Sequence, residues 1–143
     1  MRPSPKQVIM ISQASTTNAA TATGIVDTRG FDYASIDIIM ATSDDTTNNP
    51  TVFNLLESDD TVVTNAVTVS GFVGDTDWTI PAAVTTGNWG IKFGVDTRGR
   101  KRYLRLAVSP LTTQVITAIC NLSLGEELPV DTTSANVKAI VVG

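Results

Sequence analysis

The chain has 143 residues, of which 42% are hydrophobic and 17% charged, and its formal net charge is −4. This length suits one domain with one core, so we expect a single domain over residues 1–143. The lack of histidine excludes Ser-His-Asp and Cys-His catalysis and His-ligated zinc, and the single cysteine excludes an intramolecular disulfide. We therefore expect no enzymatic activity and no cofactor.

Charge and hydrophobic pattern also limit the partners of the chain. A negative net charge gives no general attraction to nucleic acid, and no apolar run reaches the roughly 18 residues that a membrane helix needs. The first residues include two prolines and no long apolar stretch, so they do not resemble a secretory signal. Residues 1–5 are expected to form an N-terminal arm.

Threonine and valine are abundant, and asparagine, aspartate and glycine separate the apolar segments, which is typical of an all-β chain. We expect an antiparallel β-sandwich of about eight to ten short strands, in its jelly-roll form. In chain order the predicted strands are Gln7–Ile11, the segment before Asp27, Ala34–Met40, Thr51–Glu57, Val67–Val73, Trp78–Ile80, Asn88–Val95, Leu104–Val108, Thr113–Ser123 and Val137–Val142.

The side-chain alternation also predicts which face of each strand lies inward. Every second residue of Asn88–Val95 is apolar, beginning with Trp89, and the same holds for Ala34–Met40 and Leu104–Val108. Thr113–Ser123 is apolar on both faces, so we expect it either in the middle of a sheet or covered by a partner. Residues 130–143 are expected to form a C-terminal arm or an added strand, paired within this chain or with a neighbouring copy. The stretch LGEELP at 124–129 is the candidate for a short helical turn.

The pentapeptide VDTRG occurs twice, at Val26–Gly30 and at Val95–Gly99. Aspartate first and glycine fourth is the preferred pattern of a type I turn, in which the glycine can adopt a positive φ. Each copy is followed by a predicted strand, so we expect two similar β-hairpins within one sandwich. Arg29 and Arg98 should then lie exposed near the turn tips.

One segment is strongly basic. It contains half of the ten lysines and arginines of the chain, and it has no aromatic side chain beyond Tyr103 to stack on bases. One interpretation is a solubilising rim that protects a sheet edge, and the other is electrostatic docking onto an acidic protein partner. The candidate docking residues are Arg98, Arg100, Lys101, Arg102 and Arg105.

Other candidate groups have simpler interpretations. The acidic pairs lie in predicted turns without an EF-hand pattern, although DTDW could hold a shallow calcium site. Trp78 could form a sugar-binding platform, whereas Trp89 belongs to an inward face. Cys120 lies on a buried face, which favours an unreactive thiol. The acidic pairs are Asp44-Asp45, Asp59-Asp60, Asp75/Asp77 and Glu126-Glu127.

Three segments resemble a set of small structural proteins of tailed bacteriophages. These are VDTRGFDYASIDIIMATS, then VFNLLESDDTVV, then GRKRYLRLAVSP, within roughly residues 24–110. In those proteins a D-x-x-G-[FY]-D strand start is followed by a strand ending in L-x-E-S-D-D and by a late K-R-Y-L-R-L-like strand. No motif is recognised after Pro110.

The resemblance implies a β-sandwich or jelly-roll virion protein of the head cement or decoration type. Such a protein assembles in the host cytoplasm, forms a homotrimer and binds the outer surface of the major capsid protein shell. It needs no cofactor, and it contacts neither nucleic acid nor membrane directly. The alternatives are another virion component, such as a tail or baseplate sandwich, and a carbohydrate-binding module that uses Trp78.

Overall fold

The computed structural model describes residues 5–17, 20–124 and 137–143. These residues form strands and one short 3-10 turn, η1 (Val63–Asn65), which confirms the all-β prediction. The strands are β1 (Lys6–Thr16), β2 (Ala22–Asp27), β3 (Tyr33–Met40), β4 (Val52–Ser58), β5 (Val67–Val73), β6 (Trp89–Asp96), β7 (Tyr103–Ser109), β8 (Gln114–Ser123) and β9 (Val137–Val142).

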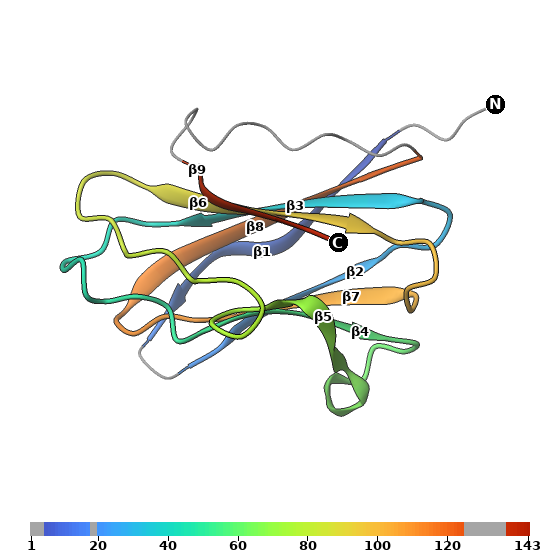
Figure 1. Ribbon diagram of the computed structural model, residues 1–143, viewed down its shortest axis with the longest axis horizontal. Coiled ribbons are helices and arrows are strands. Elements are labelled where there is room, and N and C mark those ends of the chain that lie inside the picture. The colour runs from blue at the N-terminus through green and yellow to red at the C-terminus, as the bar shows by residue number, and fades with distance from the viewer. Residues whose placement is uncertain (1–4, 18–19, 125–136) are drawn as a thin grey trace.

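The strands form two sheets that pack face to face, as Figure 1 shows. One sheet has the order β1-β8-β3-β6-β9, and the other has the order β2-β7-β4-β5. The neighbouring strands are antiparallel except for β6 and β9, which are parallel. The predicted β-sandwich is therefore confirmed, and β8 lies inside its sheet between β1 and β3, as its two apolar faces predicted.

The connections between strands correct one prediction. From β1 to β8, only β4 and β5 are successive strands of the same sheet, and every other connection passes from one sheet to the other. The two VDTRG segments therefore do not form hairpins. Residues 28–32 join β2 to β3 and residues 97–102 join β6 to β7, so each forms an arch between the sheets, which lie roughly 10 Å apart in a sandwich.

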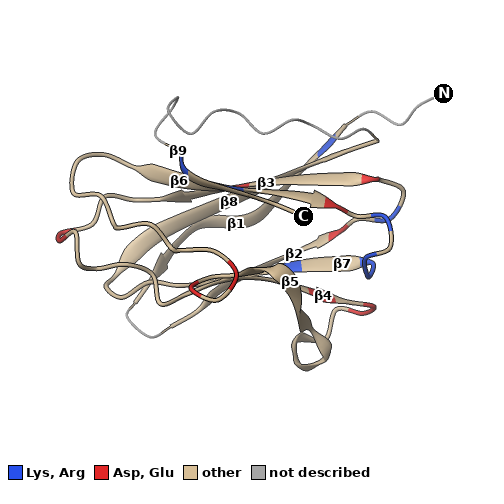
Figure 2. Ribbon diagram, in the orientation of Figure 1, with Lys and Arg blue, Asp and Glu red and all other residues tan. Residues whose placement is uncertain are grey.

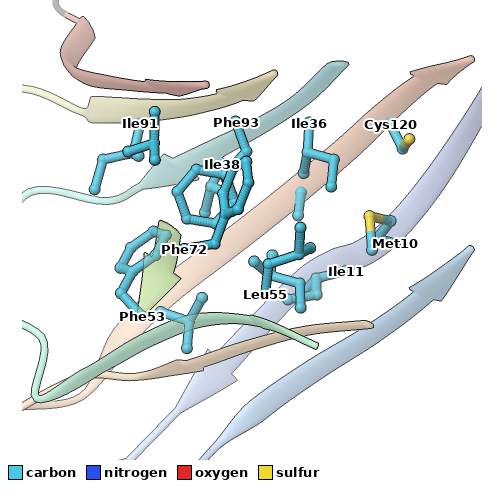
Figure 3. Packing of buried hydrophobic residues seen from close by; sticks show 14 of the residues in the cluster. Met10, Ile11, Ile36, Ile38, Phe53, Leu55, Phe72, Ile91, Phe93 and Cys120 are labelled. Carbon is cyan, nitrogen blue, oxygen red and sulfur yellow. The ribbon is translucent and has the colours of Figure 1, made fainter. Parts of the chain in front are cut away.

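The core between the sheets consists of the inward faces that the sequence alternation predicted. Aromatic rings from both sheets meet at its centre, where Phe93 of β6 contacts Phe72 of β5 and Phe53 of β4 with ring centroids 5.3 and 5.8 Å apart. Figure 3 shows these rings between the sheets, beside Ile38 and Ile91. All three phenylalanines are fully buried. Edge-to-face geometry of this kind adds to the stabilisation that apolar burial gives.

Three segments differ from the expected strands or extend them. β1 continues to Thr16, with two register shifts that bend it along β8. Trp78–Ile80 is not a strand and makes only an isolated bridge between Gly74 and Trp78, because Trp78 turns its ring into the core instead of continuing the sheet. β9 pairs with β6 of its own chain. Residues 1–4, the rest of the expected C-terminal arm (130–136) and most of LGEELP lie outside the described residues.

Cys120 is fully buried on the inward face of β8, and burial raises the pKa of its thiol to about 12, with a smaller contribution from the charge of Asp37. We expect iodoacetamide at pH 8 to leave the native protein unmodified, because the thiolate fraction is roughly a thousandfold below that of an exposed cysteine. Mass spectrometry should show one adduct only after unfolding in urea. Rapid stoichiometric labelling of the native protein would contradict the buried placement.

Candidate functional site

The two VDTRG arches have matching local geometry. The Oδ1 atoms of Asp27 and Asp96 accept the backbone N–H of Arg29 and Arg98, each at 3.0 Å. Each turn then closes one residue later than predicted, since the carbonyls of Thr28 and Thr97 accept the N–H three residues on. Gly30 and Gly99 take φ values of +89° and +80° at the third turn position, where a type II turn requires a positive φ.

The arches are also hydrogen-bonded to each other. Thr28 donates its Oγ1 hydrogen to the carbonyl of Arg102 at 2.8 Å, and Thr97 donates to the carbonyl of Phe31 at 2.7 Å. Both threonines are buried, and the antiparallel pairs β2–β7 and β3–β6 bring their arches side by side. The repeat therefore builds one rigid double arch rather than two separate turns.

The predicted docking residues gather at this end of the sandwich, but three of the five are paired with acids, one from their own arch and two from other segments. Arg98 makes two hydrogen bonds to the carboxylate of Asp96, at 2.9 and 2.6 Å. Arg102 does the same with Asp27 of the neighbouring arch, at 3.0 and 2.6 Å. The Lys101 Nζ atom lies 3.5 Å from a carboxylate oxygen of Asp59.

Arg105 and Arg100 occupy different surroundings. Arg105 is only 7% exposed, and its Nη2 atom donates to the carbonyl of Thr61 at 3.0 Å, so it supports the loop between β4 and β5. Arg100 is half-buried and makes no side-chain hydrogen bond or ion pair with the described residues.

We call the surface formed by the two arches and the β4–β5 loop the charged end. Figure 2 shows basic and acidic residues side by side there, rather than a purely basic patch.

The ion pairs of the charged end lower the pKa values of its carboxyl groups. The Arg98 guanidinium, with help from the Arg98 backbone N–H, lowers the pKa of Asp96 from 3.8 to about 2. The pKa of Asp27 is also lowered, mainly by the hydrogen bonds from Arg102. Because these pKa values are lower in the folded state, the ionised carboxylates stabilise the fold above about pH 4. This contribution is lost as the pH falls from about 4 towards 2.

We therefore predict that the free energy of unfolding decreases as the pH falls from about 4 to about 2. Urea titrations at pH 5, 4, 3 and 2 would measure the decrease. In an Arg98→Ala variant, the pKa of Asp96 should move back towards 3.8, which NMR titration of the carboxyl carbon would follow. A carboxyl pKa of Asp96 near 2 in both wild type and variant would contradict the assigned cause.

The acidic pairs in the other loops bind backbone and neighbouring side-chain groups. Asp77 accepts the N–H of Gly71 and of Val73 at 2.8 and 3.0 Å, which blocks part of the open edge of β5. Asp75 accepts the N–H of Ile80 at 2.9 Å. In the remaining pairs, Asp44, Asp45 and Asp60 accept hydrogen bonds from residues of their own loops. Asp59 forms an ion pair with Lys101 of the second arch. No cluster of three or more potential metal ligands occurs in the part of the chain that the structure describes, and Glu126-Glu127 lies outside it.

Trp78 does not form an open platform for a sugar. Its ring packs edge-on against Phe53 and Phe93, with centroids 5.6 Å apart in both cases, so it extends the aromatic core. A shallow cavity of about 380 Å³ lies instead on the outer face of the five-stranded sheet, where Gly90 lacks a side chain. Its lining is largely apolar and includes Ile39, which is 41% exposed, and the ion pair between Asp37 and Lys92 at 3.5 Å.

No family model matches the chain, and no curated protein matches its sequence. Within the described residues, no helix is long and apolar enough to cross a membrane.

The main feature that sequence reasoning missed is the pairing of Asp27 with Arg102, which joins residues 75 positions apart. The only signal for it was the repeat itself. Two identical turns in a sandwich can lie side by side, and the acids of one arch are then within reach of the cations of the other.

Proposed function

We propose that this protein is a non-enzymatic capsid cement protein of a tailed bacteriophage. In this proposal it binds the outer surface of the major capsid protein shell and stabilises the expanded head. The observation that carries the proposal is that the three segments of the phage resemblance meet at the charged end. VDTRGFDY forms the first arch, GRKRYLRL continues the second, and LLESDD leads into the β4–β5 loop; Asp27–Arg102 and Lys101–Asp59 join them. Three short motifs that are far apart in the sequence are thus joined by ion pairs at one end of the sandwich.

The strand pairing supports the jelly-roll form of the sandwich. β1 pairs with β8, β2 with β7, β3 with β6 and β4 with β5, which is the pairing produced when one long antiparallel ribbon folds over on itself. β9 adds a fifth strand outside this set. The protein would thus present a rigid body to the capsid, with its turns gathered at the ends.

A cement protein must bridge neighbouring capsid subunits without deforming, and a symmetric oligomer does this more effectively than a monomer. We propose a homotrimer on the capsid exterior. The outer face of the five-stranded sheet supplies apolar side chains for contacts between copies, including Ile9, which is 63% exposed, and Val115, which is 40% exposed.

The experiment compares particles with and without this protein. Purified protein should bind expanded shells and bind unexpanded shells poorly, and it should run as a trimer in light scattering. Particles that lack it should lose their DNA at a lower temperature, and added protein should restore the normal temperature. Equal heat resistance with and without the protein would contradict the proposal. Immunolabelling on the tail would favour a tail or baseplate component instead.

A further inference from the structure

The two arches share the sequence VDTRG but use their arginines differently. In the second arch Arg98 binds the carboxylate of its own Asp96 through two hydrogen bonds. In the first arch the equivalent carboxylate, Asp27, receives Arg102 from the other arch. The guanidinium of Arg29 therefore makes no hydrogen bond or ion pair with the described residues. Arg29 lies exposed at the tip of the first arch.

Arg100 is the second unpaired cation of the charged end. Its backbone N–H donates to the carbonyl of Thr97 at 3.1 Å, which fixes its position just after the turn, but its side chain has no such contact with the described residues. The hydrogen bonds between the arches hold both backbones in place. The exposed Arg29 and the half-buried Arg100 are thus held on a rigid support, so a partner would not have to order the loops that carry them.

We propose that Arg29 and Arg100 are the residues through which the charged end binds an acidic protein surface, each by donating to carboxylates of the partner. The identity of that partner as the capsid shell rests on the proposed function. The planar guanidinium group matches a carboxylate with two parallel hydrogen bonds. The paired cations Arg98, Lys101 and Arg102 serve the fold instead.

A protein partner fits this surface better than nucleic acid. The chain carries a net charge of −4, so only a local contact favours an anion. The guanidinium of Arg102 lies 4.8 Å from the ring centre of Tyr103, so this aromatic ring already has a cation on one face. Two separate arginines beside acidic neighbours suit individual carboxylates rather than a continuous phosphate backbone.

The test measures binding to expanded shells at several salt concentrations. An Arg29→Gln/Arg100→Gln variant should bind about tenfold more weakly or worse, with a smaller salt dependence. Its melting temperature should stay close to that of wild type, because Arg29 and Arg100 act on Asp27 and Asp96 only through weaker charge attraction and make no side-chain hydrogen bond or ion pair with the described residues. The control is Lys6→Gln/Lys138→Gln, which removes two exposed charges on β1 and β9 and should change binding by less than about twofold.

The outcomes separate this inference from the proposed function. If wild-type protein binds shells and the arginine variant binds them equally well, the inference is wrong and the proposed function stands. If the arginine variant loses binding to a DNA duplex but keeps binding to shells, the two arginines bind phosphate, and the inference is also overturned. If wild-type protein binds no shell, both the proposed function and the inference fail.

Discussion

A Phe93→Ala variant should lose about 3–5 kcal/mol of unfolding free energy, the largest effect we expect from a single substitution in this protein. Phe93 is fully buried and contacts three aromatic rings, those of Phe53, Phe72 and Trp78. Phe53 and Phe72 belong to the opposite sheet, so the substitution removes contacts that hold the two sheets together. Urea unfolding followed by circular dichroism would measure the loss.

Phe31→Ala is the matched control for that substitution. Phe31 is a half-buried phenylalanine at the first arch that packs against the edge of the core, so its truncation should cost clearly less. Equal losses in the two variants, or a loss below about 1 kcal/mol for Phe93→Ala, would contradict the central place of Phe93 in the core.

The inward faces were predictable because they depend on a local property. A strand with one face in a core must alternate, and the alternation in Asn88–Val95 identified Trp89, Ile91, Phe93 and Val95 without knowledge of any partner strand. The inner position of β8 followed from another local property, the apolar residues on both of its faces. Burial on one face is required in every β-sandwich, so these predictions did not depend on the topology.

The strand partners were not predictable in the same way. A strand that ends in VDTRG buries the same side chains whether the next strand pairs beside it or crosses to the other sheet. The arches of residues 28–32 and 97–102 are longer than the two-residue loops that most strongly indicate a hairpin. Loops of up to five residues also form hairpins, so the length of the first arch does not decide between a hairpin and an arch, and the second arch is only one residue longer. The choice depends on which sheet edges remain open once all strands have packed.

For the charged end, too, contacts between neighbouring residues were predictable from the sequence, whereas contacts between distant segments were not. Clustering along the chain predicted that Arg98, Arg100, Lys101 and Arg102 lie together, and they do so in the arch between β6 and β7 rather than at the end of a hairpin. It did not reveal Asp27 and Asp59, which come from distant segments and neutralise two of these cations. Arg105 was expected at the surface because it lies on the outer face of β7, but the loop after β4 covers it.

A Gly24→Ala variant should lose about 1–3 kcal/mol or more, because the new methyl group has no space. Gly24 lies on β2 where that strand passes close to β1 of the other sheet. A β-carbon at this position would overlap the carbonyl oxygen of Met10 and would lie 2.7 Å from its carbonyl carbon. Since the obstacle is backbone, a side-chain rotation cannot relieve the clash, and one of the two strands must move.

Gly90→Ala separates this steric effect from the general effect of replacing a strand glycine. Gly90 also lies within a strand and has no positive φ, but a β-carbon there meets only the carbonyl oxygen of Ile38, at 3.2 Å. A displacement of a few tenths of an ångström would accommodate it, so Gly90→Ala should change the unfolding free energy by less than Gly24→Ala. If thermal melts show equal losses, close packing of β1 on β2 is not what requires glycine at position 24. A larger loss for Gly24→Ala would show that the close approach of β1 to β2 depends on this missing side chain.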